Sequence, residues 1–207
     1  MDNLSIFDVD LSFEQLEYYS TAQAIAVDTE TMGLVLGRDR LCLIQLCDPK
    51  GTVSVIKVAK GQTSAPNLKK LMESPKITKL FHFARFDVAQ LTSQLSIYTK
   101  PIFCTKIASK LVRTYTNSHG LKTLVQELEG IELDKSSQCS DWGNAANLSK
   151  EQLAYASNDV LHLHGLRAKL TTMLDREGLL DLANSCFNCL PTIVELDMLR
   201  YPNIFDH

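Results

Sequence analysis

Short apolar runs separated by turn residues dominate the first part of the chain, and this pattern is typical of buried strands. Residues 24–28 form the first run. Residues 41–47 and 52–58 form two more, which are separated by the turn sequence Asp-Pro-Lys-Gly at 48–51. Because the connections between these runs are short, we expect three strands in an antiparallel meander.

The pattern then changes to strands that alternate with helices. Apolar strands are predicted near 77–83 and at 102–104, with one helix after Pro66 and another through 88–95. The chain beyond the last of these strands has helical periodicity almost throughout. A meander followed by alternating strands and helices indicates a mixed sheet that is covered by helices.

A late helix has a clear start signal. Ser149 is a suitable N-cap residue, and Gln152 three positions later completes a capping box, so a helix is predicted to begin at residue 150. Pro191 is predicted to open a further short helix, and residues 201–207 are predicted to form a tail.

Composition and length favour one globular domain. The chain has 207 residues, of which 45% are hydrophobic and 22% charged, as is ordinary for soluble proteins. We find no repeat or linker, and we therefore expect a single domain over residues 1–207. No apolar run approaches the roughly 18 residues of a membrane span. The acidic, polar start argues against a secretory signal, so we expect a cytoplasmic protein with its cysteines as thiols.

The charge of the chain is unevenly distributed. The formal net charge of −3 argues against a protein that coats long nucleic acids. Residues 57–122, however, carry twelve Lys or Arg and only two acidic residues. Each lysine taken alone fits a solvated helix face, but a block so poor in acids predicts one electropositive face that is suited to phosphates.

Acidic residues at the end of the first predicted strand are candidates for chemistry. Asp28 and Glu30 are two residues apart, and residues at this spacing on a strand point to the same side. Two like charges placed together repel each other unless a cation lies between them. The alternative interpretation is that one carboxylate caps a turn.

Two later segments add further acids. Asp87 lies in the sequence Phe-His-Phe-Ala-Arg-Phe-Asp at 81–87, where an apolar strand gives way to a helix. Tyr155 and Asp159 are four residues apart on the predicted late helix and therefore share a face. Taken alone, this last pair also fits a buried tyrosine beside an aspartate at the helix rim.

In this order, the motifs resemble the DEDD exonucleases, and the tyrosine resembles the ribonuclease D branch of that family. The sequences Arg-Leu-Cys-Leu-Ile-Gln-Leu at 40–46 and His-Gly-Leu-Lys-Thr-Leu at 119–124 strengthen the resemblance, which covers about residues 20–175. It is greatest to the short bacterial nanoRNase C type, which also ends soon after the nuclease domain. We therefore expect residues 176–207 to form a helical C-terminal extension.

The resemblance implies an α/β, ribonuclease H-like fold: a mixed five-stranded sheet flanked by helices, with a helical C-terminal segment. It also implies 3′-to-5′ hydrolysis that releases nucleoside 5′-monophosphates. Two Mg²⁺ or Mn²⁺ ions about 3.5–4 Å apart suit this chemistry, and such hard cations prefer carboxylate oxygens. The four implied ligands are Asp28, Glu30, Asp87 and Asp159. Tyr155 is expected to orient the attacking water, because a tyrosine with its usual pKa of about 10 is a poor base at neutral pH.

The resemblance also suggests five substrate contacts. Leu34 is expected to wedge against the terminal base, and Thr29 to offer backbone to the 3′-terminal nucleotide, although a packing role fits each of the two residues as well. His82 is a candidate for the terminal ribose or phosphate, although a hydrogen-bonded core histidine fits the sequence as well. His119 and Lys122 are candidates for a 5′ phosphate.

The leading hypothesis is an exoribonuclease that acts on short RNAs, dinucleotides included. One alternative is the same chemistry on longer RNA, such as tRNA 3′ ends, or on DNA. A second alternative is an inactive nucleic-acid-binding module, which predicts at least one missing carboxylate, whereas all four are present. The resemblance further implies a homo-oligomer, with an octameric ring as the expected form, and residues 179–201 are the candidate contact segment.

Overall fold

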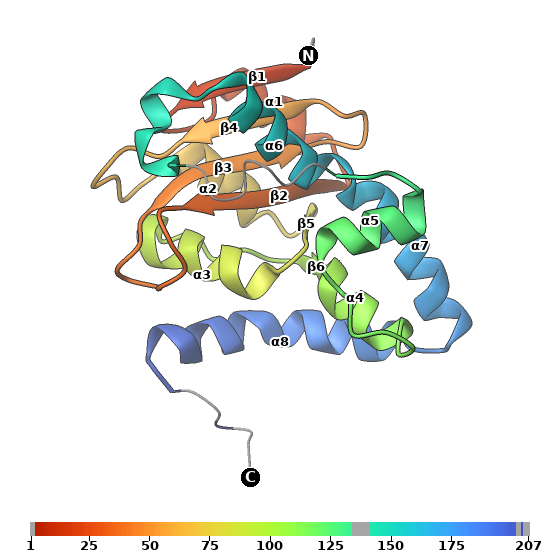
Figure 1. The fold of residues 1–207 in the computed structure, drawn as a ribbon. Coiled ribbons are helices and arrows are strands. Elements are labelled where there is room, and N and C mark those ends of the chain that lie inside the picture. Colours follow the sequence, from red (N-terminus) through yellow and green to blue (C-terminus); the bar gives the residue numbers. More distant parts are fainter. Residues whose placement is uncertain (1–2, 134–140, 202–203, 205–207) are drawn as a thin grey trace.

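The predicted meander lies at the centre of a mixed sheet. A computed structural model describes residues 3–133, 141–201 and 204, and within these residues six strands form one sheet in the order β1-β4-β3-β2-β5-β6 (Figure 1). β2 pairs antiparallel with β3, and β3 with β4, while β5 and β6 extend the sheet in parallel from β2. The strands are β1 (Leu4–Asp8), β2 (Ala24–Thr31), β3 (Leu41–Cys47), β4 (Val53–Lys57), β5 (Thr78–Phe81) and β6 (Ile102–Cys104).

Helices cover both faces of this sheet. Helix α6 packs against β2, β3 and β4, whereas α3 packs against β2, β3, β5 and β6, and α8 lies across α3 and α4 (Figure 1). All seven residues of β3 are buried, which explains why its sequence is apolar except for Gln45. The helices are α1 (Phe13–Ser20), α2 (Pro66–Met72), α3 (Ala84–Leu95), α4 (Thr105–Val112), α5 (Leu121–Glu129), the 3₁₀ helix η1 (Trp142–Asn147), α6 (Lys150–Leu161), α7 (Leu163–Arg176) and α8 (Leu180–Met198).

The expectation of five strands was wrong, because the described sheet has a sixth strand, β1, at its edge. β1 pairs in parallel with β4, a partner about fifty residues away in sequence. Three of its five residues are exposed and two are half-buried. A short strand with so little buried surface leaves no clear apolar pattern, and only its tertiary partner defines it.

The prediction for Pro191 was also wrong, because this residue lies inside α8 and does not open a new helix. An internal proline removes one helical hydrogen bond. Burial of Phe187, Leu190 and Val194 on the same helix compensates, since it holds α8 against the domain on both sides of the proline. None of the helices in the described part of the chain is long and apolar enough to cross a lipid bilayer.

The start of α6 was predicted correctly. The Ser149 side chain accepts a hydrogen bond from the Gln152 backbone, and the Gln152 side chain accepts one from the Ser149 backbone, which completes the capping box. The apolar pattern continues past residue 161, but the helix axis changes at His162, which ends α6 and precedes α7. The two helices therefore form separate elements that meet at one residue.

A partly buried hydrogen bond fixes this junction. Nδ1 of His162 lies 2.7 Å from a carboxylate oxygen of Glu129 at the end of α5, and only 17% and 13% of the two side chains are exposed. A Cβ atom on Gly165 would lie 2.0 Å from the same carboxylate, so the glycine leaves the space that Glu129 occupies. The pair joins the end of α5 to the end of α6.

We predict that Glu129→Ala lowers the free energy of unfolding by about 1–3 kcal/mol, because it removes the acceptor of a buried hydrogen bond. Urea unfolding followed by circular dichroism measures the change. The matched control is Glu132→Ala, since 81% of the Glu132 side chain is exposed and its contact with Lys122 spans 4.0 Å. A surface pair of this kind contributes little, so the control should stay within about 0.5 kcal/mol. If both variants lower the free energy of unfolding by the same amount, the contact between Glu129 and His162 does not stabilise the fold as we predict.

Candidate functional site

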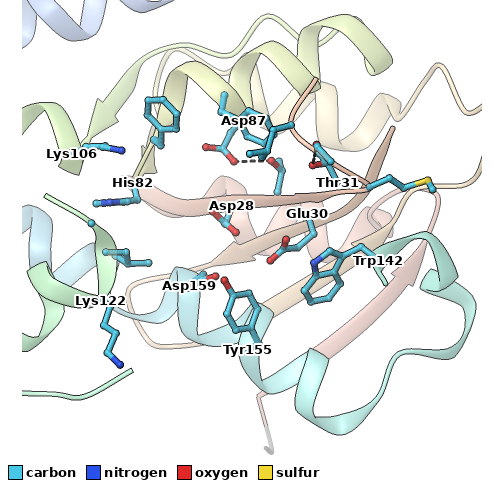
Figure 2. A pocket seen from close by; sticks show the side chains of 18 residues that line it. Asp28, Glu30, Thr31, His82, Asp87, Lys106, Lys122, Trp142, Tyr155 and Asp159 are labelled. Carbon is cyan, nitrogen blue, oxygen red and sulfur yellow. Dashed lines mark hydrogen bonds between the residues drawn. The ribbon is translucent and has the colours of Figure 1, made fainter. Parts of the chain in front are cut away.

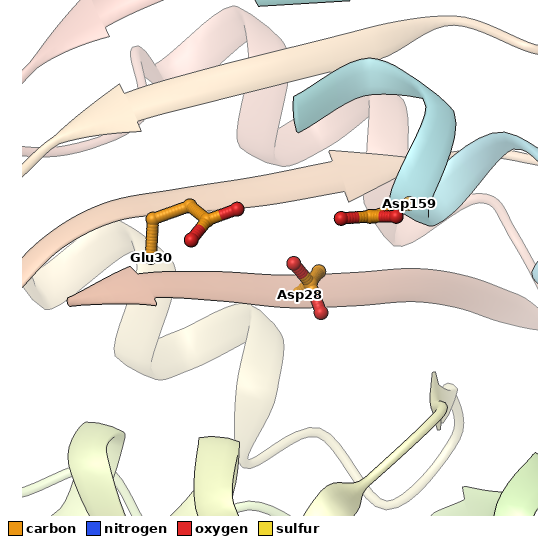
Figure 3. Close-up of side chains that lie close together, drawn as sticks. All are labelled: Asp28, Glu30 and Asp159. Carbon is orange, nitrogen blue, oxygen red and sulfur yellow. The ribbon is translucent and has the colours of Figure 1, made fainter. Parts of the chain in front are cut away.

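Three carboxylates meet between the central strand and a late helix. Asp28 and Glu30 extend from the same side of β2, and Asp159 approaches them from α6 (Figure 3). Oxygen atoms of all three groups lie within 4.8 Å of one another. This donor set is the kind that hard divalent cations prefer, and a bound cation would relieve the mutual repulsion of the carboxylates. The acidic cluster therefore fits a divalent metal ion.

Asp87 reaches the same pocket from the opposite side of β2. It lies in the first turn of α3, and its Oδ1 accepts a 2.7 Å hydrogen bond from the Thr29 hydroxyl (Figure 2). Burial raises the pKa of Asp87 well above its usual range; the Thr29 hydrogen bond opposes this rise, and the negative charge of Asp159 adds to it. Among the described residues, the group of carboxylates within 4.8 Å of one another contains Asp28, Glu30 and Asp159 but not Asp87. The fourth predicted ligand therefore lies in the same pocket but outside this close group.

Tyr155 and Asp159 share the pocket face of α6, as their spacing predicted. The tyrosine is 7% exposed, and its ring centroid lies 6.0 Å from that of Trp142. Burial raises the pKa of Tyr155 above its usual value, and the charges of Asp159 and Glu30 raise it further. In the metal-free protein the hydroxyl therefore stays protonated at neutral pH and can donate a hydrogen bond.

These groups line one pocket with a volume of about 810 Å³. Four of the five predicted substrate contacts, Thr29, Leu34, His82 and Lys122, also line it. Leu34 is 80% exposed, so its side chain is open to a ligand, as a wedge would require. Both the hydroxyl and the backbone N–H of Thr29 donate hydrogen bonds to Asp87, so the backbone contact that the sequence suggested stays a prediction.

The two histidines differ in their positions. Nδ1 of His82 lies 3.0 Å from the Thr105 hydroxyl, so this residue is both hydrogen-bonded to the core and part of the pocket wall. His119 is not among the residues that line the pocket, and its Nδ1 lies 2.9 Å from the Ser109 hydroxyl. The structure therefore does not bring His119 into the site with Lys122.

Sequence reasoning missed several residues of the pocket wall. Lys106, at the start of α4, lines the pocket, and its Nζ lies 4.3 Å from the centroid of the Phe83 ring. The basic block at 57–122 contains Lys106 and was the available signal, but it could not single out one lysine. Trp142 and Met32 also line the pocket, although no motif indicated them. The three residues come from different parts of the chain, and only the tertiary structure brings them to one pocket.

This fold and site together define a class of protein. A mixed sheet flanked by helices is shared with ribonuclease H-like nucleases of known structure. The family of 3′-5′ exonucleases matches residues 6–175 of the chain. The chain belongs to this family, which confirms the resemblance drawn from its motifs.

Several solved structures of one relative are similar to this chain over almost its whole length. NrnC from Brucella melitensis is 45% identical, with a TM-score of 0.94 over 100% of both chains. Its structure bound to pGG gives 46% identity and a TM-score of 0.93, covering 99% of this chain and 98% of that one. Its structure with bound Mg²⁺ gives 44% identity and a TM-score of 0.90, covering 99% of each chain.

Ribonuclease D proteins are similar over a shorter part of their length. Ribonuclease D from Acidiphilium cryptum is 37% identical over 161 residues, which cover 76% of this chain and 39% of that protein. The chain thus spans about two fifths of the length of the ribonuclease D proteins with which it aligns.

The burial of Asp87 predicts a pH-dependent stability in the metal-free protein. Because the pKa of Asp87 is higher in the folded than in the unfolded protein, ionisation of this carboxyl favours the unfolded state. The contribution of Asp87 to stability is therefore fully present below its unfolded pKa of about 4, and it is lost as the pH rises through the raised pKa of the folded state. Asp87→Asn should therefore stabilise the protein in EDTA on the order of 2 kcal/mol near pH 8 and much less near pH 4.

Urea unfolding at both pH values measures this difference. Asp175→Asn is the matched control, because this aspartate is exposed on α7. We expect this variant and the wild-type protein to have the same free energy of unfolding at both pH values. If Asp87→Asn leaves the stability unchanged near pH 8, the carboxylate is not destabilised by burial.

Proposed function

We propose that this chain is a metal-dependent 3′-5′ exoribonuclease that hydrolyses short oligoribonucleotides, dinucleotides included, to nucleoside 5′-monophosphates. The observation that carries the proposal is the group of Asp28, Glu30 and Asp159 in one pocket, with Asp87 beside them. A pocket of about 810 Å³ is within the usual size for sites that enclose small ligands. The structure of Brucella melitensis NrnC bound to pGG supports a short substrate.

We propose that the four carboxylates hold two Mg²⁺ or Mn²⁺ ions. When bound, such ions activate the attacking water and stabilise the charge on the leaving 3′ oxygen. The Mg²⁺-bound structure of the same relative supports this assignment. Asp28 and Glu30 present their carboxylates from a rigid central strand, while Asp87 and Asp159 complete the set from helices on the two faces of the sheet.

The other residues of the pocket position the substrate. Tyr155, whose hydroxyl stays protonated, orients the attacking water by donating or accepting a hydrogen bond. Leu34 packs against a base, and the Thr29 backbone contacts the terminal nucleotide. Lys106 and Lys122 attract the 5′ phosphate from one end of the pocket, where Figure 2 shows both beside His82.

We further propose one domain over residues 1–207, a cytoplasmic location and a homo-octameric assembly. The candidate contact segment is residues 179–201, which contain α8. Ala183 and Phe187 on its inner face are buried, whereas Leu182 and Tyr201 are 50% and 60% exposed, so this segment offers apolar surface to another subunit.

Hydrolysis of 5′-labelled RNAs of two to ten nucleotides tests the main proposal. We expect the dinucleotide to be hydrolysed fastest with Mg²⁺ or Mn²⁺, EDTA to abolish the reaction, and Asp28→Ala to lower the rate at least about 100-fold, because the metal ligands supply several kcal/mol of transition-state stabilisation. Asp175→Asn is the control variant and should retain full activity.

The substrate series separates the alternatives. If longer RNA or a matched DNA duplex is trimmed while dinucleotides persist, a processing nuclease replaces the proposal. If the wild-type protein cuts nothing with either metal, the inactive binding module is the better description.

A second prediction concerns the positive end of the pocket. Lys106→Gln and Lys122→Gln should each raise KM for a 5′-phosphorylated dinucleotide about 5- to 10-fold and have little effect on the 5′-hydroxyl form, because a charge-assisted contact contributes about 1.5–3 kcal/mol at most. Steady-state kinetics on both substrates measures the difference. Lys76→Gln, at an exposed position away from the pocket, is the control. Equal effects on both substrates would exclude a 5′-phosphate contact.

A further inference from the structure

Trp142 is the only tryptophan of the chain, and its side chain is an unusual part of the pocket wall. The residue is 3% exposed, yet among the described residues no hydrogen-bond acceptor lies within reach of its indole Nε1. A buried N–H group without an acceptor is costly, and buried tryptophan N–H groups usually have a partner. A ligand of the pocket is a natural source of the missing acceptor.

The segment that carries Trp142 is firmly attached to the sheet. Nη2 of Arg40 donates a 2.7 Å hydrogen bond to the carbonyl oxygen of Gly143, and Nη1 of the same arginine donates a 3.1 Å hydrogen bond to the carbonyl of Val58. A carboxylate oxygen of Asp141 accepts a 3.0 Å hydrogen bond from the Gly143 backbone. Trp142 is therefore held in place by the start of β3, more than one hundred residues earlier in the sequence.

Packing fixes the orientation of the indole ring as well. Its centroid lies 6.0 Å from that of Tyr155, with an angle of 38° between the ring planes. A Cβ atom on Gly143 would lie 3.4 Å from Cε of Met32, so the backbone beside the tryptophan is closely packed. A donor held in this way loses little conformational entropy when it binds a ligand.

The pocket has two chemically different ends. Figure 2 shows Lys106, His82 and Lys122 on one side of the carboxylates, and Trp142 on the other side, next to Glu30. The cations suit a phosphate, whereas the tryptophan end is apolar. A short RNA with its 5′ phosphate at the cations and its scissile phosphate at the carboxylates would place its 3′-terminal nucleoside beside Trp142.

We propose that Trp142 recognises the 3′-terminal nucleoside and that its indole N–H donates a hydrogen bond to an oxygen or nitrogen acceptor of the ribose or base. This inference rests on the proposed function, because it takes the polarity of the substrate from the proposed reaction. Arg40 then acts as a positioning residue through its hydrogen bond to Gly143.

Intrinsic fluorescence gives a direct test, since every tryptophan photon comes from Trp142. A nucleoside 5′-monophosphate in the presence of Mg²⁺ is a suitable probe, because it carries the terminal nucleoside and has no internal phosphodiester to hydrolyse. We expect a saturable change in emission with the four ribonucleoside monophosphates. Inorganic phosphate alone, which suits the cationic end, should leave the emission unchanged.

Kinetics on a dinucleotide tests the hydrogen bond itself. Trp142→Phe keeps an aromatic ring beside Tyr155 but removes the N–H group, so KM should rise about 3- to 10-fold while kcat changes less than about 2-fold. Tyr98→Phe is the matched control, because Tyr98 is 63% exposed and does not line the pocket. A KM effect that disappears with a 3′-terminal deoxynucleotide identifies the ribose as the acceptor, and one that varies with the terminal base identifies the base.

Two results would overturn the inference: an emission spectrum that no nucleotide changes, or a Trp142→Phe variant that loses Tm and kcat together at unchanged KM. The second result would show that the indole only packs against Tyr155. If the wild-type protein hydrolyses no dinucleotide but nucleoside monophosphates still change the emission, the nucleoside site stands and the proposed exoribonuclease activity fails.

Discussion

Electrostatic repulsion between the carboxylates of Asp28, Glu30 and Asp159 is the constraint on which the rest of the site depends. Oxygens of the three groups lie within 4.8 Å of one another, partly shielded from water. Side chains on flexible loops would move apart under this repulsion. Here two of them extend from β2, which has a paired strand on each side, and the third extends from a helix that packs on the same sheet. A rigid scaffold therefore maintains an arrangement that a divalent cation would stabilise.

Helix α6 carries Asp159 and Tyr155, and several contacts fix its position. A capping box defines its first turn, and the hydrogen bond between His162 and Glu129 holds the residue that follows its last turn. The same hydrogen bond connects it to α5, whose first residues, Leu121 and Lys122, line the pocket. Helix α6 and the pocket wall opposite it therefore share one support, so the shape of the pocket depends on contacts outside it.

The pocket combines three environments in sequence: cations at one end, carboxylates in the middle and an apolar wall with Trp142 at the other (Figure 2). A phosphate, a scissile phosphodiester and a nucleoside match these environments in turn. Under the proposed function, this order explains how four carboxylates can face a negatively charged substrate, since the lysines would supply the attraction and bound metal ions would offset the acids.

The sequence alone determined the features that depend on near neighbours in the chain. Short apolar runs predicted β3 and β6, the spacing of Ser149 and Gln152 predicted the capping box of α6, and the spacing of Asp28 with Glu30 predicted their common direction. Only the tertiary structure decided the features that depend on distant partners. The edge strand β1 is defined by β4, and the continuity of α8 through Pro191 depends on burial against α3 and α4. Likewise, Trp142 lies in the pocket because Arg40, over one hundred residues earlier, holds the backbone beside it. Local periodicity records which side of an element is buried, but it contains no information about which distant residue lies there.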